Sequence, residues 1–232
     1  MSVLNLALTS RYLAASFKDK AVLVWDMPSI PAPVPPDFAL QEVARLGHSA
    51  AANAVLIHGD NTYVVSGSGD RTIKIWETSS WTCVRTILGH TKGIASLAFS
   101  LDYTCLVSGS SDETIRIWDL GTGAERACLA GHSNLVRSLT VARDKDGEEI
   151  IVSGSYDESI VVWRKEKGGD DGPDRGTWVA RRFDAKSALR QIGTGRVGEP
   201  EAGMQIRVFK VLCDGQRVFC ATQRNCVVVW EL

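Results

Sequence analysis

The sequence predicts an all-β protein of about five repeated four-stranded units, with the last unit one strand short. Three observations predict this fold. Five of the seven tryptophans recur at the same phase of a repeat, an aspartate lies six residues before four of them, and a Gly-His pair precedes three of them. The five are Trp25, Trp76, Trp118, Trp163 and Trp230.

The spacing within the repeats is regular. Asp70 follows His48 by 22 residues and precedes Trp76 by six, and the next repeat has the same intervals. The third complete repeat has three extra residues between its histidine and its aspartate. Two weaker copies lack the Gly-His pair, and in the last one Arg224 replaces the aspartate.

Each repeat also has the composition of a strand, a turn and a further strand. Val64–Gly67 and its counterparts are short runs of small and branched residues, typical of a strand buried on both faces. A polar turn follows, for example 68–71, and then an outer strand such as 72–76, in which the isoleucines share one face.

The repeats, each running from Gly-His to Trp, recur with a period of about 40 to 45 residues, which resembles that of WD40 repeats, the four-stranded blades of a β-propeller. The resemblance covers nearly the whole chain and places blades at about 1–46, 47–88, 89–130, 131–183 and 205–232. Insertions are expected at the proline-rich stretch 28–39 and at 165–204.

The WD40 resemblance implies that a histidine, a serine, an aspartate and the tryptophan form a hydrogen-bonded tetrad within a blade. The implied tetrads are His48, Ser66, Asp70 and Trp76; His90, Ser108, Asp112 and Trp118; and His132, Ser153, Asp157 and Trp163.

The ends of the chain predict an incomplete, open propeller. The last blade has three strands, and the chain begins at an innermost strand without a spare one that could complete it. We therefore expect the C-terminal part of a larger propeller, with an unpaired edge at 225–230 and possible self-association through its open ends.

Blades three to five resemble fungal F-box/WD-repeat proteins in the phrases 89–94, 128–137, 152–164 and 207–211. This narrower resemblance implies the substrate-recognition propeller, or a fragment of one, of an SCF-type ubiquitin ligase that binds phosphorylated peptides. No F-box precedes the first repeat in this sequence.

The same resemblance suggests which residues contact a partner. Arg137, five residues after His132, matches a phosphate-binding arginine, whereas Asn53 and Ala95 stand at this place in the preceding blades. The full set of candidate partner-binding residues is Arg137, Tyr156, Lys18, Arg71 and Lys92.

Two alternatives stand beside the ligase receptor. The first is a general WD40 scaffold in another multiprotein complex. The second is a propeller enzyme, which we disfavour because the Ser, His and Asp trio recurs three times, whereas a catalytic site occurs once.

Composition predicts no cofactor, metal, nucleic acid or membrane. The net charge is −1, and no apolar run is long enough to cross a bilayer. The six cysteines form no CxxC motif, and we interpret them as small core residues in a reducing compartment. We expect a cytoplasmic or nuclear protein, or one found in both places.

Overall fold

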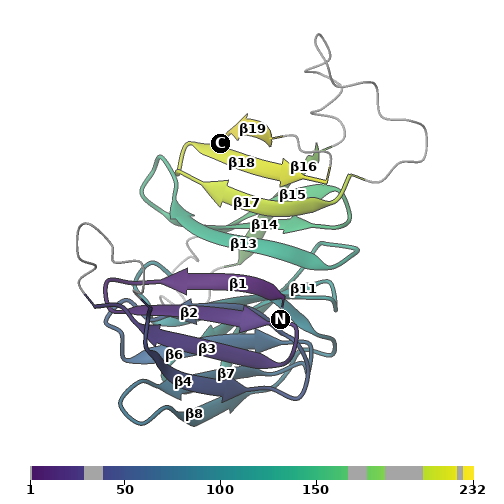
Figure 1. The fold of residues 1–232 in the computed structure, drawn as a ribbon. Helices are drawn as coiled ribbons and strands as arrows, with labels where there is room; N and C mark the ends of the chain where they lie inside the picture. Colours follow the sequence, from purple (N-terminus) through teal and green to yellow (C-terminus); the bar gives the residue numbers. More distant parts are fainter. Residues whose placement is uncertain (1, 29–38, 167–176, 186–205, 224–226) are drawn as a thin grey trace. The chain divides into compact units, whose positions relative to one another are not determined.

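A computed structural model describes residues 2–28, 39–166, 177–185, 206–223 and 227–232, and it confirms the all-β prediction (Figure 1). The described residues form four sheets of four strands and one sheet of three, each antiparallel and built from consecutive strands. The final sheet has three strands in the described chain, as the sequence predicts.

The strands divide into five blades in chain order. Blade one contains β1 (Val3–Leu8), β2 (Tyr12–Phe17), β3 (Ala21–Asp26) and β4 (Glu42–Gly47). Blade two contains β5 (Ala52–Ile57), β6 (Tyr63–Ser68), β7 (Ile73–Glu77) and β8 (Thr82–Ile87). Blade three contains β9 (Ile94–Phe99), β10 (Cys105–Ser110), β11 (Thr114–Asp119) and β12 (Glu125–Ala130). Blade four contains β13 (Val136–Arg143), β14 (Glu149–Ser155), β15 (Ser159–Lys165) and β16 (Trp178–Asp184), and blade five contains β17 (Val208–Cys213), β18 (Arg217–Thr222) and β19 (Val227–Glu231).

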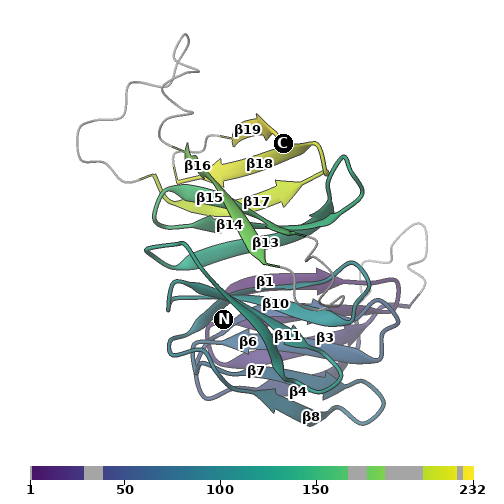
Figure 2. The same cartoon turned by 180° about the vertical axis from the view of Figure 1, so that it is seen from behind.

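The chain forms two compact units. The first comprises Met1–Leu97 and Asp119–Ala124, and the second comprises Ala98–Trp118 and Glu125–Leu232. Blades one and two lie in the first unit. Blades four and five and most of blade three lie in the second, whose blade-four strands are seen from the other side in Figure 2.

The repeated tryptophan lies on the third strand of its blade, and in blades one to four a fourth strand lies beyond it. In blade two, β7 pairs with both β6 and β8, and Trp76 is opposite Val64. The fourth strand was harder to recognise because it is largely exposed and therefore lacks a run of apolar residues: five of the six residues of β8 are not buried.

The innermost strand carries a β-bulge in four blades. The register with the second strand shifts between Val3 and Asn5, Ala52 and Ala54, Val136 and Ser138, and Val208 and Lys210. The residues skipped by the ladder are Leu4, Asn53, Arg137 and Phe209. A bulge redirects the side chain of the extra residue, so these four positions are structurally equivalent.

The residue after the bulge connects neighbouring blades. Val55 N donates to Asn5 Oδ1 at 3.3 Å between blades one and two. Val211 N donates to Ser138 Oγ at 3.1 Å between blades four and five, where the bond is buried. The same register position thus satisfies a backbone N–H of the next blade in both units.

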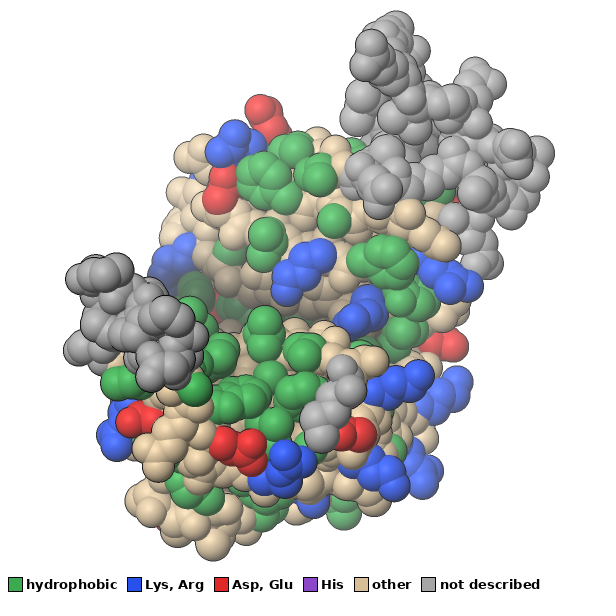
Figure 3. Space-filling view, in the orientation of Figure 1, with side chains coloured by type: hydrophobic (Ala, Val, Ile, Leu, Met, Phe, Trp, Pro, Cys, Tyr) green, Lys and Arg blue, Asp and Glu red, His purple; other side chains and the backbone are tan. Residues whose placement is uncertain are grey.

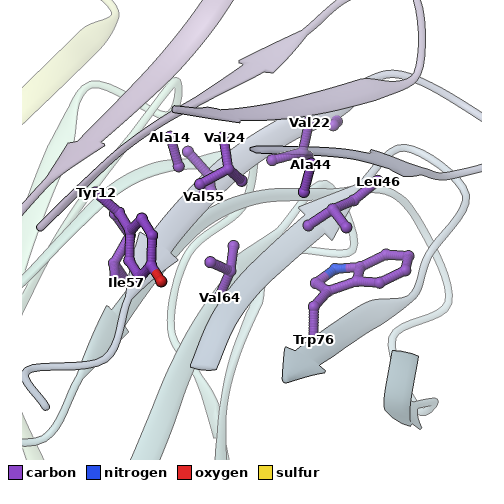
Figure 4. Packing of buried hydrophobic residues seen from close by; sticks show 11 residues of the cluster. Tyr12, Ala14, Val22, Val24, Ala44, Leu46, Val55, Ile57, Val64 and Trp76 are labelled. Carbon is purple, nitrogen blue, oxygen red and sulfur yellow. The ribbon is translucent and has the colours of Figure 1, made fainter. Parts of the chain in front are cut away.

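The apolar core lies between the sheets, where the facing sides of adjacent blades meet. Figure 4 shows the cluster between blades one and two, in which Tyr12 lies beside Ile57 and Leu46 lies near Trp76. Gly154 lets blades four and five approach closely, because a Cβ there would lie 2.5 Å from Val208 and 2.7 Å from Val211.

Two expectations about the segments need correction or lie outside the described chain. The range 165–204 is not simply an insertion, because Lys165 ends β15 and β16 forms within it. Strand β16 is mostly exposed and rich in arginine, so its sequence does not look like that of a buried strand. Residues 29–38, 167–176 and 186–205, and the edge residues 225 and 226, lie outside the described residues.

The cysteines only partly fit the interpretation as core residues. Cys220 is fully buried, and burial raises the pKa of its thiol to about 12. Cys83 and Cys128 are exposed because they lie on the outward side of the fourth strands β8 and β12, so the prediction was wrong for these two. The five described cysteines are free thiols, and Cys226 lies outside the described residues.

In the described part of the chain, no helix is long and apolar enough to span a membrane. Nor do its histidine, cysteine and carboxylate side chains gather in any group of three or more that could hold a metal ion.

Candidate functional site

The tetrad residues of blade two lie within hydrogen-bonding distance of one another. His48 Nδ1 is 3.0 Å from Asp70 Oδ2, and its Nε2 is 2.8 Å from Ser66 Oγ. Trp76 Nε1 donates to the same serine oxygen at 2.9 Å. Because Ser66 Oγ accepts from the indole, its own proton is available to His48 Nε2, which assigns a neutral imidazole that donates from Nδ1 to Asp70.

The environment favours the charge states that this network requires. Burial lowers the pKa of His48, although Asp70 acts in the opposite direction. Burial alone would raise the pKa of Asp70, but hydrogen bonds from Thr72 and from the backbone of Ser49 hold it well below its usual range. The result is a neutral histidine beside an ionised aspartate.

Blade four has the same network with an added arginine. His132 Nδ1 lies 2.9 Å from Asp157 Oδ2, and Ser153 Oγ lies 2.8 Å from His132 Nε2 and 2.9 Å from Trp163 Nε1. Arg182 of β16 donates from Nη2 to Asp157 Oδ2 at 3.1 Å. Burial raises the pKa of Asp157, but the bonds from His132, Ser159 and Ser133 outweigh it and lower the pKa below its usual range.

A cation also binds the carbonyl of the glycine before the histidine in both blades. Lys74 Nζ donates to Gly47 O at 2.9 Å, and Arg182 Nη1 donates to Gly131 O at 2.6 Å. The two cations come from different strands, because Val161 stands in blade four at the place of Lys74. Arg182 of the fourth strand thus makes the contact that Lys74 of the third strand makes in blade two.

In blade three, Trp118 Nε1 donates to Ser108 Oγ at 2.8 Å, and Asp112 Oδ1 accepts from Thr114 Oγ1 at 2.6 Å. His90 is buried. Blade one has Ala15 at the serine position, and its Asp19 is exposed. The tetrad serines Ser66, Ser108 and Ser153 are fully buried and bonded to indole nitrogens, so a substrate could not reach them as nucleophiles.

The second unit carries a partly exposed group of aromatic and arginine side chains at one end of blades four and five. Tyr156, in the turn before β15, makes an edge-to-face contact with Phe209, with ring centroids 5.7 Å apart. The guanidinium of Arg207 lies 5.1 Å from the centre of the Tyr156 ring. Phe209 remains 41% exposed. We call Tyr156, Arg207 and Phe209 the aromatic cluster.

Arg137 lies at the bulge of β13, in the same blade as Tyr156, and is half-buried. The backbone N–H of Tyr156 donates to Leu135 O at 3.0 Å, which ties the turn to the start of this strand. Figure 3 shows hydrophobic side chains interspersed with lysine and arginine on the visible face of the second unit.

The other predicted contact residues lie in the first unit. Lys18, Arg71 and Lys92 are exposed, and Arg71 follows the turn aspartate with a left-handed φ of 73°. Arg137 and Tyr156 belong to the second unit.

Sequence reasoning missed Arg207 and Phe209. A signal for Phe209 was present, because it occupies the bulge position already compared among Asn53, Ala95 and Arg137. Extending that comparison to the last blade would have found it. Arg207 lacks such a signal, since its contact with Tyr156 is a matter of tertiary packing.

Five antiparallel sheets with recurring His-Ser-Asp-Trp networks define a repeat protein built from the four-stranded blades of a β-propeller. The family model "WD domain, G-beta repeat" matches residues 40–77, 81–119 and 123–164, which together make up just over half of the chain. The chain therefore belongs to the WD40-repeat family.

Among curated proteins, the chain is similar to ribosome biogenesis protein BOP1 homologs of insects. It is 35% identical to the Anopheles gambiae protein over 81 residues, which is 33% of this chain and 9% of that protein. It is 40% identical to the Aedes aegypti protein over 63 residues, 26% of this chain and 7% of that protein. The matched region thus spans less than a tenth of the length of these relatives.

Proposed function

We propose that this chain is a non-catalytic scaffold that binds other proteins within a multiprotein complex. The observation that carries the proposal is the aromatic cluster on blades four and five. Tyrosine and arginine are enriched among residues that dominate protein interfaces, and aromatic rings contribute large contact areas there. Phe209 lies on strand β17, Arg207 directly precedes that strand, and Tyr156 lies in the short turn between β14 and β15. The neighbouring strands hold the cluster in place, which limits the entropy lost on binding.

The relatives favour the general scaffold over the ligase receptor. The relatives are named as ribosome biogenesis proteins, and we propose that this chain likewise acts in the assembly of a large complex. The resemblance to F-box/WD proteins is not shown by these matches. The ubiquitin-ligase receptor function is therefore treated as one possible outcome of the purification experiment below. A nuclear or cytoplasmic location stays a prediction.

The test is affinity purification of the tagged chain from cells that express it, followed by quantitative mass spectrometry. The wild type should retain a defined set of proteins, and the double variant Tyr156→Ala/Phe209→Ala should lose them by tenfold or more. Leu212→Ala is the matched control, because Leu212 is an exposed apolar residue of the same strand β17 outside the cluster.

Full retention of partners by the double variant would exclude the cluster as the binding surface. If the wild-type chain were recovered from a native extract without any other protein, the scaffold function would be refuted. Recovery of ribosome-assembly factors would support the proposed assembly role, whereas recovery of a cullin-based ligase core would replace it by the receptor function.

A second variant examines phosphate recognition at the same end of blade four. If a captured partner is phosphorylated where it contacts the chain, Arg137→Glu should weaken it by tenfold or more, because a bidentate cation is replaced by a repelling carboxylate. Calorimetry with phosphorylated and unphosphorylated peptides from that partner checks this. Equal affinities for the two peptides would make the binding independent of phosphate.

A further inference from the structure

The core between blades three and four repeats the core between blades one and two, position by position. Each cluster is built from the second, third and fourth strands of one blade and the first three strands of the next. Ala44 and Leu46 of β4 correspond to Ala127 and Leu129 of β12, and Trp76 corresponds to Trp163.

The two cores differ most at one position. Tyr12 begins β2, and the residue that begins β10 at the same place is Cys105. Tyr12 is a buried member of the first core cluster, and Cys105 is partly buried against the other. A tyrosine ring in the first core is thus replaced by a much smaller thiol in the other.

The partner of that ring is retained in both cores. Trp81 directly precedes β8, and its ring meets Tyr12 edge to face, with centroids 5.4 Å apart and planes at 78°. Trp178 occupies the same register in blade four, where it is paired with Lys165, two residues after Trp163. Both tryptophans are partly buried against their core clusters.

A cleft of about 270 Å³ lies where the ring is missing. Its apolar walls are formed by Cys105, Val107, Ile117, Ala127, Ile151 and Trp178. Its rim carries the exposed side chains of Arg126 and Lys165 and the half-buried carboxylate of Glu149. The volume lies below the range of about 300–1,000 Å³ typical of sites for drug-sized ligands, and it suits a single large side chain.

We propose that this cleft binds an aromatic side chain of a partner protein, which contacts Trp178 as Tyr12 contacts Trp81. The core between blades one and two holds the aromatic ring of Tyr12 at this place, which indicates an aromatic occupant for the cleft. The rim also carries Glu148, so it holds two cations and two carboxylates around the apolar walls. The inference rests on the scaffold function, and it assigns a second anchor point on a different edge of the second unit from the aromatic cluster.

The first experiment uses p-cresol, the side chain of tyrosine, as the probe on the full chain. Alkylation of Cys105 by iodoacetamide is followed by peptide-resolved mass spectrometry, so the exposed Cys83 and Cys128 serve as internal references. Saturating p-cresol should slow alkylation of Cys105 at least threefold and leave the two references unchanged. An aliphatic alcohol of similar size, 4-methyl-1-pentanol, should protect clearly less.

Absence of protection would overturn the proposal, and equal protection by the alkanol would overturn its aromatic specificity. Neither result depends on a variant that must fold, and neither bears on the capture of partners by the aromatic cluster. Failure of the cleft is therefore distinguishable from failure of the scaffold function.

Two variants sharpen the test. Cys105→Tyr fills the cleft from within and should abolish p-cresol binding measured by NMR titration, whereas Cys128→Tyr, on the exposed side of β12, should retain it. Tyr12→Cys should create a second p-cresol site in the first unit, and p-cresol should raise its melting temperature. Unchanged p-cresol binding by Cys105→Tyr would contradict the assignment of the site.

The partner itself is addressed with the same pair of variants. Among the proteins captured by the wild type, at least one should be lost at least tenfold with Cys105→Tyr and retained with Cys128→Tyr. Retention of every partner by a folded Cys105→Tyr variant would overturn docking at the cleft.

Discussion

Arg182 and His132 share one oxygen of Asp157. Arg182 Nη2 lies 3.1 Å and His132 Nδ1 lies 2.9 Å from Asp157 Oδ2, and the backbone N–H of Ser133 lies at the same 2.9 Å. The carboxylate is almost fully buried, whereas the arginine side chain is 47% exposed. A cation from the fourth strand thus joins a network that the second and third strands, the turn between them and the loop before the first strand build.

Replacing Arg182 tests this added contact. We expect Arg182→Ala to reduce the free energy of unfolding by about 0.5–1 kcal/mol, because a half-exposed cation gains little from its ion pair but also binds Gly131 O. Arg181→Ala is the control, since the guanidinium of Arg181 lies over the ring of Phe183, 4.9 Å from its centre, rather than against Asp157. Equal losses of stability in urea titrations would show that Arg182 adds nothing to the network.

Removing a tetrad carboxylate should cost more. Asp70→Ala leaves His48 Nδ1 and the backbone N–H groups of Ser49 and Thr72 without their acceptor, so a loss of about 1–3 kcal/mol is expected. The same range is expected for Asp112→Ala. Asp19 is exposed and faces no Gly-His pair in its blade, so Asp19→Ala should cost no more than about 0.5 kcal/mol. Similar melting temperatures for the Asp70 and Asp19 variants would refute the network.

Stability should fall on acidification. The pKa values of Asp70 and Asp157 are lower in the folded chain than in the unfolded chain, so the unfolded state takes up protons first as pH falls. The lowered pKa of His48 acts in the same direction, because the unfolded histidine is protonated first below about pH 6.5. The contribution of His48 is thus complete above that pH, and those of the aspartates are complete above about pH 5 and are lost below it.

Chemical denaturation between pH 4 and 8 measures this dependence. The double variant Asp70→Asn/Asp157→Asn should be less stable at pH 7 and should lose less stability between pH 6 and 4 than the wild type. An unchanged slope would show that these carboxylates do not titrate at lowered pKa values.

Two turn glycines offer a matched pair. Gly215 has a φ of +93°, and a Cβ there would collide with the backbone carbonyl oxygen of Arg143. Gly147 has a φ of +80°, but a Cβ would meet nothing within 4 Å. Gly147→Ala should cost about 1 kcal/mol from the backbone conformation alone, whereas Gly215→Ala should cost about 2–4 kcal/mol because the backbone must also move. Equal costs in thermal unfolding would mean that the turn between β17 and β18 shifts freely.

The sequence by itself determined the fold class and the composition of the networks. Histidine, serine, aspartate and tryptophan recur at spacings set by strand length and turn geometry, which are local properties of the chain. The second strands were recognisable for the same reason, since strands buried on both faces are continuously apolar. The fourth strands were harder, and β16 was expected in part as an insertion, because an exposed outer strand needs no apolar pattern.

Only the tertiary structure decided which surface residues meet. Arg207, directly before blade five, contacts Tyr156 of blade four. Arg182 of the fourth strand makes in blade four the contact that Lys74 of the third strand makes in blade two. Neither contact can be inferred from the repeat pattern. The cleft beside Trp178 likewise depends on a single difference, a thiol at Cys105 where Tyr12 fills the equivalent core. A cavity forms where the side chains between two sheets do not fill the available space. The repeat pattern specifies which residue types are buried, but not whether together they fill that space.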